Sequence, residues 1–252
     1  MFPVGDDNSD RLRTPYINYT LIALNILVFI FLQKMGTDLA FTYSYSTVPG
    51  EILTGKDIVT DSHVMRDPYT NQRFLLPGLG VTPIPVWFTL ITSMFMHGGW
   101  AHLLGNMMYL WVFGDNIENR LGHLRYLFFY LLVGIIASLT HVVTTNVMGG
   151  SLLIPSLGAS GAISGILGAY ILLYPTRSVH VFFIFSIISV PALLALGLWI
   201  VFQIVNGLGA LGGSEAGGVA YAAHIGGFFA GLLLIKFFTP AEEKVYKRRR
   251  FF

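Results

Sequence analysis

The chain has 252 residues, of which 54% are hydrophobic and only 11% are charged, and its mean hydropathy is +0.66. Soluble globular domains carry roughly 25% charged residues, so this composition indicates a protein whose solvent is a lipid bilayer. The formal net charge is only +2, and the absence of cysteine excludes disulfides, thiolate zinc sites and cysteine nucleophiles.

Residues 1–16 are expected to form a cytoplasmic tail. They hold three aspartates and two arginines before the first apolar run: Asp6, Asp7, Asp10, Arg11 and Arg13. Because a basic start and a small-residue cleavage site are missing, we expect the first apolar run to be a retained anchor rather than a signal peptide.

Six apolar segments follow, separated by loops. A transmembrane helix needs about 20 mostly apolar residues, and shorter ones are tolerated where neighbours or local bilayer thinning cover the mismatch. The predicted fold class is therefore all-α: a polytopic bundle of six transmembrane helices within a membrane domain at 17–238. The predicted spans are Ile17 to Gln33, Trp100 to Ile117, Leu124 to Thr144, Ser160 to Tyr174, Val179 to Val205 and Val219 to Phe238.

Positive charges indicate which side of the membrane each connection faces. Arginines fall before span one, between spans two and three, and between spans four and five, on the same side as the basic tail at 239–252. That tail holds five of the fifteen Lys and Arg, from Lys244 onward. Both termini are therefore predicted to be cytoplasmic. The arginines concerned are Arg11, Arg13, Arg120, Arg125 and Arg177.

Two connections are unusual. The extracytoplasmic loop at 37–99 is long and rich in Pro and Gly, so we expect it to pack against the helices. Its end, Val86 to Met96, is apolar enough to lie in the membrane interface. The stretch Asn206 to Gly218 contains six glycines in thirteen residues, which predicts a mobile cap.

Four polar residues lie in spans two, four and six, where polar groups are costly and usually functional. His102 and Asn106 are four residues apart and share one helical face, Ser160 opens span four, and His224 lies about one turn into span six. All three spans begin on the outer side if both termini are cytoplasmic. The topology therefore brings the four residues to a similar depth.

Small residues on spans four and six would let these two helices approach closely. A serine and a histidine could then reach hydrogen-bonding distance, which is the minimum geometry for activating a serine hydroxyl as a nucleophile. His102 and Asn106 would donate to the oxyanion of a tetrahedral intermediate, beside the backbone N–H of Ser160. The small residues are Gly161, Gly165 and Ala169 in span four, and Ala223, Gly227 and Gly231 in span six.

Other polar residues in the spans have structural interpretations. A serine in a membrane helix usually bonds its own backbone or packs against a neighbouring helix, which we prefer for Ser138 and Ser164. His141 and His180 are interpreted as structural or proton-relay residues near helix ends.

Three motifs, in this order along the chain, resemble the rhomboid family over about Trp87 to Gly231. They are His102-x-x-x-Asn106, Gly158-Ala159-Ser160-Gly161 and Ala223-His224-Ile225-Gly226-Gly227. The resemblance implies a six-helix core that hydrolyses transmembrane substrates with a Ser-His dyad and no catalytic acid. It implies Ser160 as nucleophile, His224 as general base and later acid, and His102 with Asn106 as oxyanion side chains, without a cofactor.

The chain departs from the family pattern at two places. Trp87-Phe88 stands where many relatives have Trp-Arg, and Ser164 stands where an aromatic ring often stacks on the histidine. The orientation of His224 must therefore be fixed in another way. The resemblance also implies that span five, bent at Pro191, moves together with the loop after it to admit substrate.

Two other functions stay open. A catalytically inactive rhomboid-like scaffold that binds membrane proteins would share the fold, although such proteins typically lack the serine or the histidine. A channel or small-solute transporter would predict inverted repeats and midplane charges, and neither is seen.

The expected partners are transmembrane substrates and the lipid bilayer, with no nucleic acid, in a bacterial plasma membrane. His97 and His102 have no carboxylate or cysteine at ligand spacing, so no metal site is expected.

Overall fold

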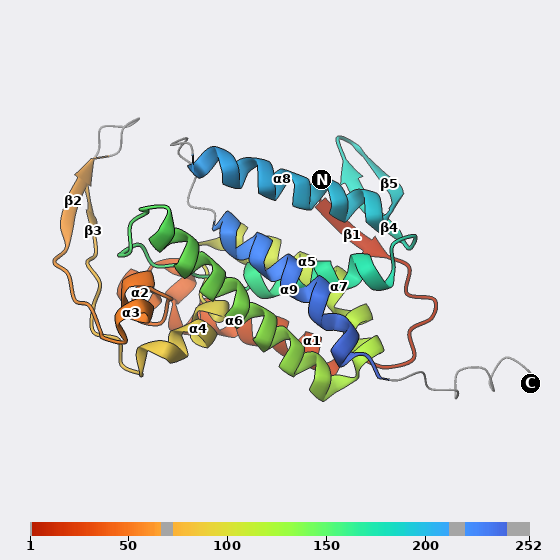
Figure 1. The fold of residues 1–252 in the computed structure, drawn as a ribbon, viewed down its shortest axis with the longest axis horizontal. Helices are drawn as coiled ribbons and strands as arrows, with labels where there is room; N and C mark the ends of the chain where they lie inside the picture. Colours follow the sequence, from red (N-terminus) through yellow and green to blue (C-terminus); the bar gives the residue numbers. More distant parts are fainter. Residues whose placement is uncertain (1, 67–72, 212–219, 241–252) are drawn as a thin grey trace, which may run out of the picture.

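The computed structural model describes residues 2–66, 73–211 and 220–240, and it is mostly helical (Figure 1). The largest helices pack side by side in one bundle, as the predicted fold class requires. The helices of this bundle are α1 (Tyr16–Leu27) with its π-helical extension η1 (Val28–Leu32), α5 (Trp100–Leu121), α6 (His123–Val147), α7 (Ser160–Leu173), α8 (Ala192–Leu211) and α9 (Tyr221–Phe238).

Three of the described helices are long and apolar enough to cross a membrane, which agrees with a membrane protein. They are α6, residues Ala192–Gly209 of α8, and α9. Tyr16–Leu32, Val86–Phe95 and Ser160–Leu173 are apolar but shorter. The count of six membrane spans therefore stays a prediction.

The prediction that span five begins at Val179 is wrong. Residues 178–191 form an antiparallel hairpin of β4 (Ser178–Phe183) and β5 (Ser186–Pro191). This stretch is rich in Val, Ile and Phe, which fit an extended strand better than a helix. Pro191 ends β5 and therefore does not bend a helix, and His180 lies in β4 rather than near a helix end.

The N-terminal residues complete this sheet. Strand β1 (Phe2–Asp6) pairs antiparallel with β4, giving the order β1-β4-β5. The fold is therefore not purely helical, because one end of the bundle carries a three-stranded sheet. Since β5 runs directly into α8, the N-terminal strand is linked through the sheet to the base of that helix (Figure 1).

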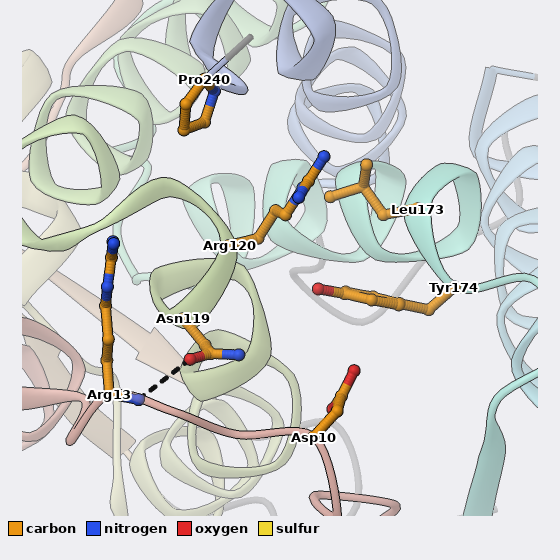
Figure 2. Close-up of a pocket in the computed structure, with 7 residues that line it drawn as sticks. All are labelled: Asp10, Arg13, Asn119, Arg120, Leu173, Tyr174 and Pro240. Atoms are coloured by element: carbon orange, nitrogen blue, oxygen red, sulfur yellow. Dashed lines mark hydrogen bonds between the residues drawn. The ribbon is translucent and has the colours of Figure 1, made fainter. Parts of the chain in front are cut away.

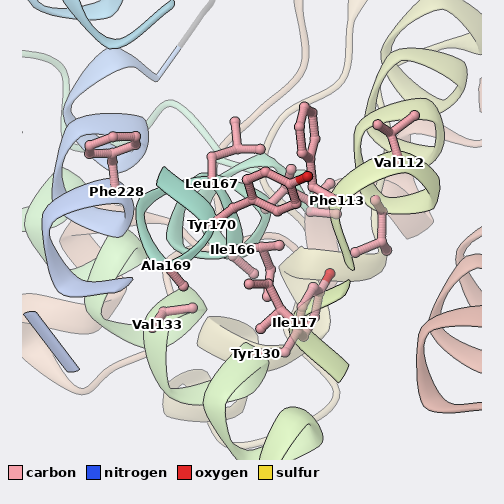
Figure 3. Close-up of a cluster of buried hydrophobic side chains, with 14 of the residues drawn as sticks. Val112, Phe113, Ile117, Tyr130, Val133, Ile166, Leu167, Ala169, Tyr170 and Phe228 are labelled. Atoms are coloured by element: carbon pink, nitrogen blue, oxygen red, sulfur yellow. The ribbon is translucent and has the colours of Figure 1, made fainter. Parts of the chain in front are cut away.

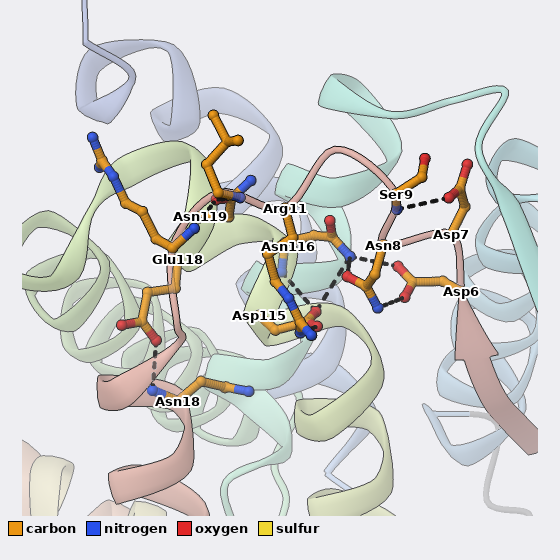
Figure 4. Close-up of polar contacts among 12 residues, drawn as sticks. Asp6, Asp7, Asn8, Ser9, Arg11, Asn18, Asp115, Asn116, Glu118 and Asn119 are labelled. Carbon is orange, nitrogen blue, oxygen red and sulfur yellow. Dashed lines mark hydrogen bonds and ion pairs between the residues drawn. The ribbon is translucent and has the colours of Figure 1, made fainter.

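A polar cluster ties β1 to the C-terminal part of α5 (Figure 4), and a hydrogen bond from Tyr170 ties it to α7. The Asp6 carboxylate accepts hydrogen bonds from Asn116 Nδ2, at 2.7 Å, and from the Tyr170 hydroxyl. Arg11 pairs with Asp115 at 2.7 Å. Burial raises the pKa of Asp6 to about 7, so ionising this carboxyl near neutral pH costs free energy.

The loop at 37–99 is folded and packs against the bundle, as expected. The helices α3 and α4 contact α6, and Thr47 forms a β-bridge with Ser156 ahead of α7. The apolar end of the loop folds into three short helical turns. The turn η2 (Lys34–Gly36) precedes the loop. The loop itself contains α2 (Leu39–Ser44), α3 (Pro49–Thr54), β2 (His63–Arg66), β3 (Arg73–Leu76), η3 (Val86–Phe88), α4 (Thr89–Thr92) and η4 (Ser93–Phe95).

The core lies where α5, α6 and α7 meet (Figure 3). Large rings fill it, and Tyr126, Tyr130 and Tyr170 are all fully buried. The ring of Phe113 stands edge-on to that of Tyr170, with centroids 5.0 Å apart. This packing surrounds α7, the helix that Ser160 opens, with rigid neighbours on two sides.

Helices α7 and α9 approach more closely than side chains would allow, because glycines line their contact. A Cβ added at Gly227 would lie 2.2 Å from the Gly161 carbonyl oxygen, and one at Gly231 would lie 1.9 Å from that of Gly165. A Cβ at Gly168 would lie 2.0 Å from the Phe228 carbonyl oxygen. We call this contact the α7–α9 seam.

The stretch predicted as a mobile cap is partly helical. Residues 206–211 continue α8, so that part of the prediction is wrong, and 212–218 lie outside the described residues. Most of the basic tail, residues 241–252, also lies outside them.

Candidate active site

Ser160 and His224 lie together at one end of the α7–α9 seam. Ser160 is the first residue of α7, and His224 is in the first turn of α9. The Nε2 atom of His224 lies 2.8 Å from Ser160 Oγ. This geometry lets the serine hydroxyl donate to the ring, which is the arrangement that a serine nucleophile and its base require.

The chain before Ser160 is shaped by a glycine. Gly158 has a positive φ of 118°, which favours glycine, and its N–H donates to the Ser93 carbonyl at 2.8 Å. A Cβ there would lie 2.7 Å from His102 Nε2 and 3.6 Å from Asn106 Nδ2. Both side chains therefore adjoin the backbone two residues before Ser160, and they come from one face of α5.

Asn106 is held by His97, a residue for which the sequence predicted no role. Its Nδ2 lies 2.9 Å from His97 Nε2. The loop that carries His97 is fixed by Gln33, whose side chain accepts from the His97 N–H and donates to its carbonyl, each at 2.9 Å. Asn106 Nδ2 has two hydrogens, so one stays free for an oxyanion when the other bonds His97.

The rings of His97 and His102 lie next to each other, with centroids 5.1 Å apart. Among the described residues there is no group of three or more His, Cys, Asp or Glu that could hold a metal ion.

The second nitrogen of His224 has a partner that sequence reasoning missed. Gln203 on α8 places its Oε1 2.8 Å from His224 Nδ1, and Gln203 is only 6% exposed. The available signal was an uncharged polar residue inside the apolar run at 192–205. Nothing in the sequence indicated that this side chain faces α9.

Aromatic rings also border His224, although none stands at position 164. The rings of Trp199 and His224 have centroids 6.1 Å apart and are tilted by 33°, and Tyr221 stands edge-on at 6.5 Å. Ser164 instead donates to the Ser160 carbonyl at 2.6 Å, as the structural interpretation of Ser164 predicted. Trp199 on α8 thus contributes an aromatic neighbour in place of the expected one.

An apolar cavity of about 370 Å³ opens beside this site, between α5, α8 and the sheet. Tyr109 and Phe113 line it from α5, and Trp199, Phe202 and Gln203 line it from α8. Since Gln203 contacts His224, the cavity lies next to the candidate site.

A second pocket, of about 310 Å³, lies at the other end of α7 (Figure 2). It is lined by Asp10, Arg13, Asn119, Arg120, Leu173, Tyr174 and Pro240. Leu173 is thirteen residues beyond Ser160 on the same helix, about 20 Å along its axis. No serine or histidine lines this pocket, so it takes no part in the Ser160 site.

Comparison with known proteins gives a consistent result. A family model described as "Rhomboid domain" matches residues 85–241. "Rhomboid protein 1, mitochondrial" of Saccharomyces cerevisiae is 33% identical over 162 residues, which are 64% of this chain and 44% of that protein. "Rhomboid protease GluP" of Bacillus subtilis is 36% identical over 151 residues, 59% of this chain and 26% of that protein.

A chloroplast protein matches as well. "Rhomboid-like protein 11, chloroplastic" of Arabidopsis thaliana is 27% identical over 161 residues, 60% of this chain and 52% of that protein. The chain therefore spans about half, or less, of the length of these relatives.

Proposed function

Because the chain belongs to the rhomboid family, we propose that it is an intramembrane serine endopeptidase with a Ser160–His224 dyad. The observation that carries the proposal is the 2.8 Å contact between Ser160 Oγ and His224 Nε2. A serine that only packs between helices needs no base at its hydroxyl. The relative named as a protease, GluP, supports the same reaction class.

The proposed reaction is acyl transfer to serine followed by hydrolysis. Ser160 Oγ attacks the scissile carbonyl carbon while His224 Nε2 takes the hydroxyl proton. The imidazolium then gives this proton to the leaving amine as the C–N bond breaks, which leaves an acyl ester on Ser160. His224 next takes a proton from a water that attacks the ester, and gives it to Ser160 Oγ as the C–O bond breaks, so each half-reaction ends with a neutral ring.

The oxyanion of each tetrahedral intermediate would be stabilised by three donors. These are the His102 ring, the Asn106 amide and the backbone N–H of Ser160, and both side chains adjoin Gly158 just before the nucleophile. In water-poor surroundings, loss of one such donor typically costs about 3 kcal/mol in the transition state, or about two orders of magnitude in rate.

The proposed substrates are transmembrane segments of other membrane proteins. The apolar cavity between α5 and α8 adjoins the dyad through Gln203, which lines the cavity and contacts His224, so we propose that substrate segments enter from this side. We propose six spans with both termini cytoplasmic, which places Ser160 toward the outer surface. The relatives include mitochondrial and chloroplastic proteins as well as a Bacillus one, and a bacterial plasma membrane stays our proposal.

The test compares wild type, Ser160→Ala, His224→Ala and Asn106→Ala in liposomes. Fluorophosphonate labelling and cleavage of a model transmembrane substrate are measured for each variant. We expect both activities to be lost in the first two variants and to fall about 100-fold in the third. A folded wild type that neither labels nor cleaves contradicts the proposal and favours a scaffold that binds membrane proteins.

A further inference from the structure

The base in this site needs its ring proton on one particular nitrogen. If His224 Nε2 accepts from Ser160, the neutral ring must carry its hydrogen on Nδ1. An imidazole free to exchange tautomers would spend much of its time with a hydrogen on Nε2, where it cannot accept the serine proton. An acceptor facing Nδ1 removes this problem.

Gln203 supplies that acceptor. Its Oε1 lies 2.8 Å from His224 Nδ1, and its side chain is nearly fully buried against α9. Among the described residues the ring has two hydrogen-bond partners, Gln203 on one nitrogen and Ser160 on the other. Trp199 and Tyr221 border the ring and limit its tilt, but ring contacts do not distinguish the two tautomers.

We propose that Gln203 is a positioning residue, which holds the His224 ring in the Nδ1–H tautomer and aims Nε2 at Ser160. This inference rests on the proposed function. A neutral amide fixes the tautomer without adding a negative charge, so it orients the base while stabilising the imidazolium less than a carboxylate would.

The location of Gln203 has a mechanical consequence. Ser160 and His224 are held by the α7–α9 seam, whereas Gln203 belongs to α8. A displacement of α8 carries the acceptor away from Nδ1 and leaves the dyad without its orienting partner. The base is therefore competent only while α8 is packed against α9.

The first experiment measures labelling of Ser160 by a fluorophosphonate against pH for wild type, Gln203→Met and Gln203→Glu. Methionine keeps the length and burial of glutamine without an oxygen acceptor, and we expect labelling to slow about 10- to 100-fold. Glutamate restores an acceptor, so its rate at high pH should return to within about tenfold of wild type. Its carboxylate stabilises the imidazolium, which moves the acidic limb of the profile to higher pH.

Asn25→Leu is the matched control. Asn25 is a fully buried amide on α1 that donates to the Leu21 carbonyl of its own helix, so the variant also removes a buried amide from a membrane helix. We expect its pH profile to match wild type. A merely structural role for Gln203 predicts equal losses for Gln203→Met and Gln203→Glu with an unshifted pH profile, and that result overturns the proposal.

A second measurement reports the tautomer without using activity. Nitrogen-15 NMR of histidine-labelled protein, with His224 assigned by the His224→Ala difference, should show the Nδ1–H form in wild type and Gln203→Glu. Gln203→Met should show a mixture of tautomers. An unchanged tautomer in Gln203→Met overturns the inference, whereas a correct tautomer in a wild type that fails to label overturns only the proposed function.

Discussion

The α7–α9 seam and helix α8 hold the two sides of the His224 ring in different ways. In the seam, backbone meets backbone: a Cβ at Gly231 would come within 1.9 Å of the Gly165 carbonyl oxygen. On α8, a Cβ at Gly197 would meet nothing within 4 Å. The outer face of α8 exposes a row of large apolar side chains, at Leu193, Leu194, Leu198, Val201, Phe202, Val205 and Leu208.

The seam and α8 therefore have different roles in the candidate site: one sets the distance between Ser160 and His224, and the other carries the acceptor for His224 Nδ1. Close backbone contact leaves little freedom for relative movement, so the seam fixes the distance between Ser160 and His224. Helix α8 presents an apolar face to lipid, borders the apolar cavity, and carries the acceptor for His224 Nδ1. Ser160 and His224, the proposed nucleophile and base, are thus built on the closely packed seam, and the proposed orienting residue Gln203 lies on the more loosely packed α8.

The largest effect is expected from Gly231→Ala. The added methyl group meets a carbonyl oxygen of α7, so the helices must separate, at a cost of roughly 2–3 kcal/mol in stability. A displacement of about 1 Å between serine and histidine should lower the labelling rate about 100-fold. Thermal unfolding and fluorophosphonate labelling measure the two effects.

Gly197→Ala on α8 is the matched control, because its methyl group enters open space. We expect its labelling rate and stability to stay close to those of wild type. Equal losses of labelling and stability in the two variants would show that the seam and α8 are equally tightly packed.

The second prediction concerns a tether across the apolar cavity. Tyr109 on α5 and Phe202 on α8 line the cavity from opposite sides, and the chain has no native cysteine. A Tyr109→Cys, Phe202→Cys double variant joined by a short thiol cross-linker should hold α8 closed. Cleavage of a transmembrane substrate should then fall more than about tenfold, while labelling by the small fluorophosphonate persists.

Longer cross-linkers should progressively restore cleavage, and the single-cysteine variants treated with the same reagent serve as controls. If cleavage is unaffected by the shortest tether, α8 does not need to move for substrate access.

The smallest effect is expected at Asp6, in the sheet that leads into α8. Its pKa is about 7 in the folded protein and 3.8 in the unfolded chain, so the folded state binds the extra proton between these values. The stability that this proton contributes is therefore fully present below about pH 3.8 and is lost as the pH rises from there through 7. Allowing for partial solvent screening, the decrease is on the order of 2 kcal/mol.

Asp6→Asn should remove this dependence, because asparagine has no proton to lose. The difference in melting temperature between pH 5 and pH 8, compared for wild type and Asp6→Asn, measures it. A pH dependence that persists unchanged in the variant would assign it to another group.

The order and spacing of small and polar residues were sufficient to place the main parts of the site. The alternation of spans predicted that Ser160 and His224 share one end of the bundle, and the structure brings them to 2.8 Å. Glycines four residues apart predicted a close approach of their helices. These inferences succeed because they depend on periodicity along one helix and on which end of a helix a residue occupies.

The hairpin at 178–191 was mistaken for a helix because apolar residues of either structure give the same hydropathy. Its Val, Ile and Phe content was a local signal for strands, which pair with each other, but the pairing of β4 with β1, about 175 positions away in sequence, could not be read from the local pattern. Likewise, the partners Gln203 and His97 depend on how α8 and the loop before α5 are rotated toward the site.

The sequence by itself determined that this chain is a mostly helical membrane protein, and which ends of which helices carry Ser160, His224, His102 and Asn106. Only the tertiary structure decided which side chain faces His224 Nδ1 and which segment begins α8. The physical reason is that hydropathy and periodicity are properties of one segment. Strand pairing and side-chain partners are set by contacts between segments that lie far apart in the chain.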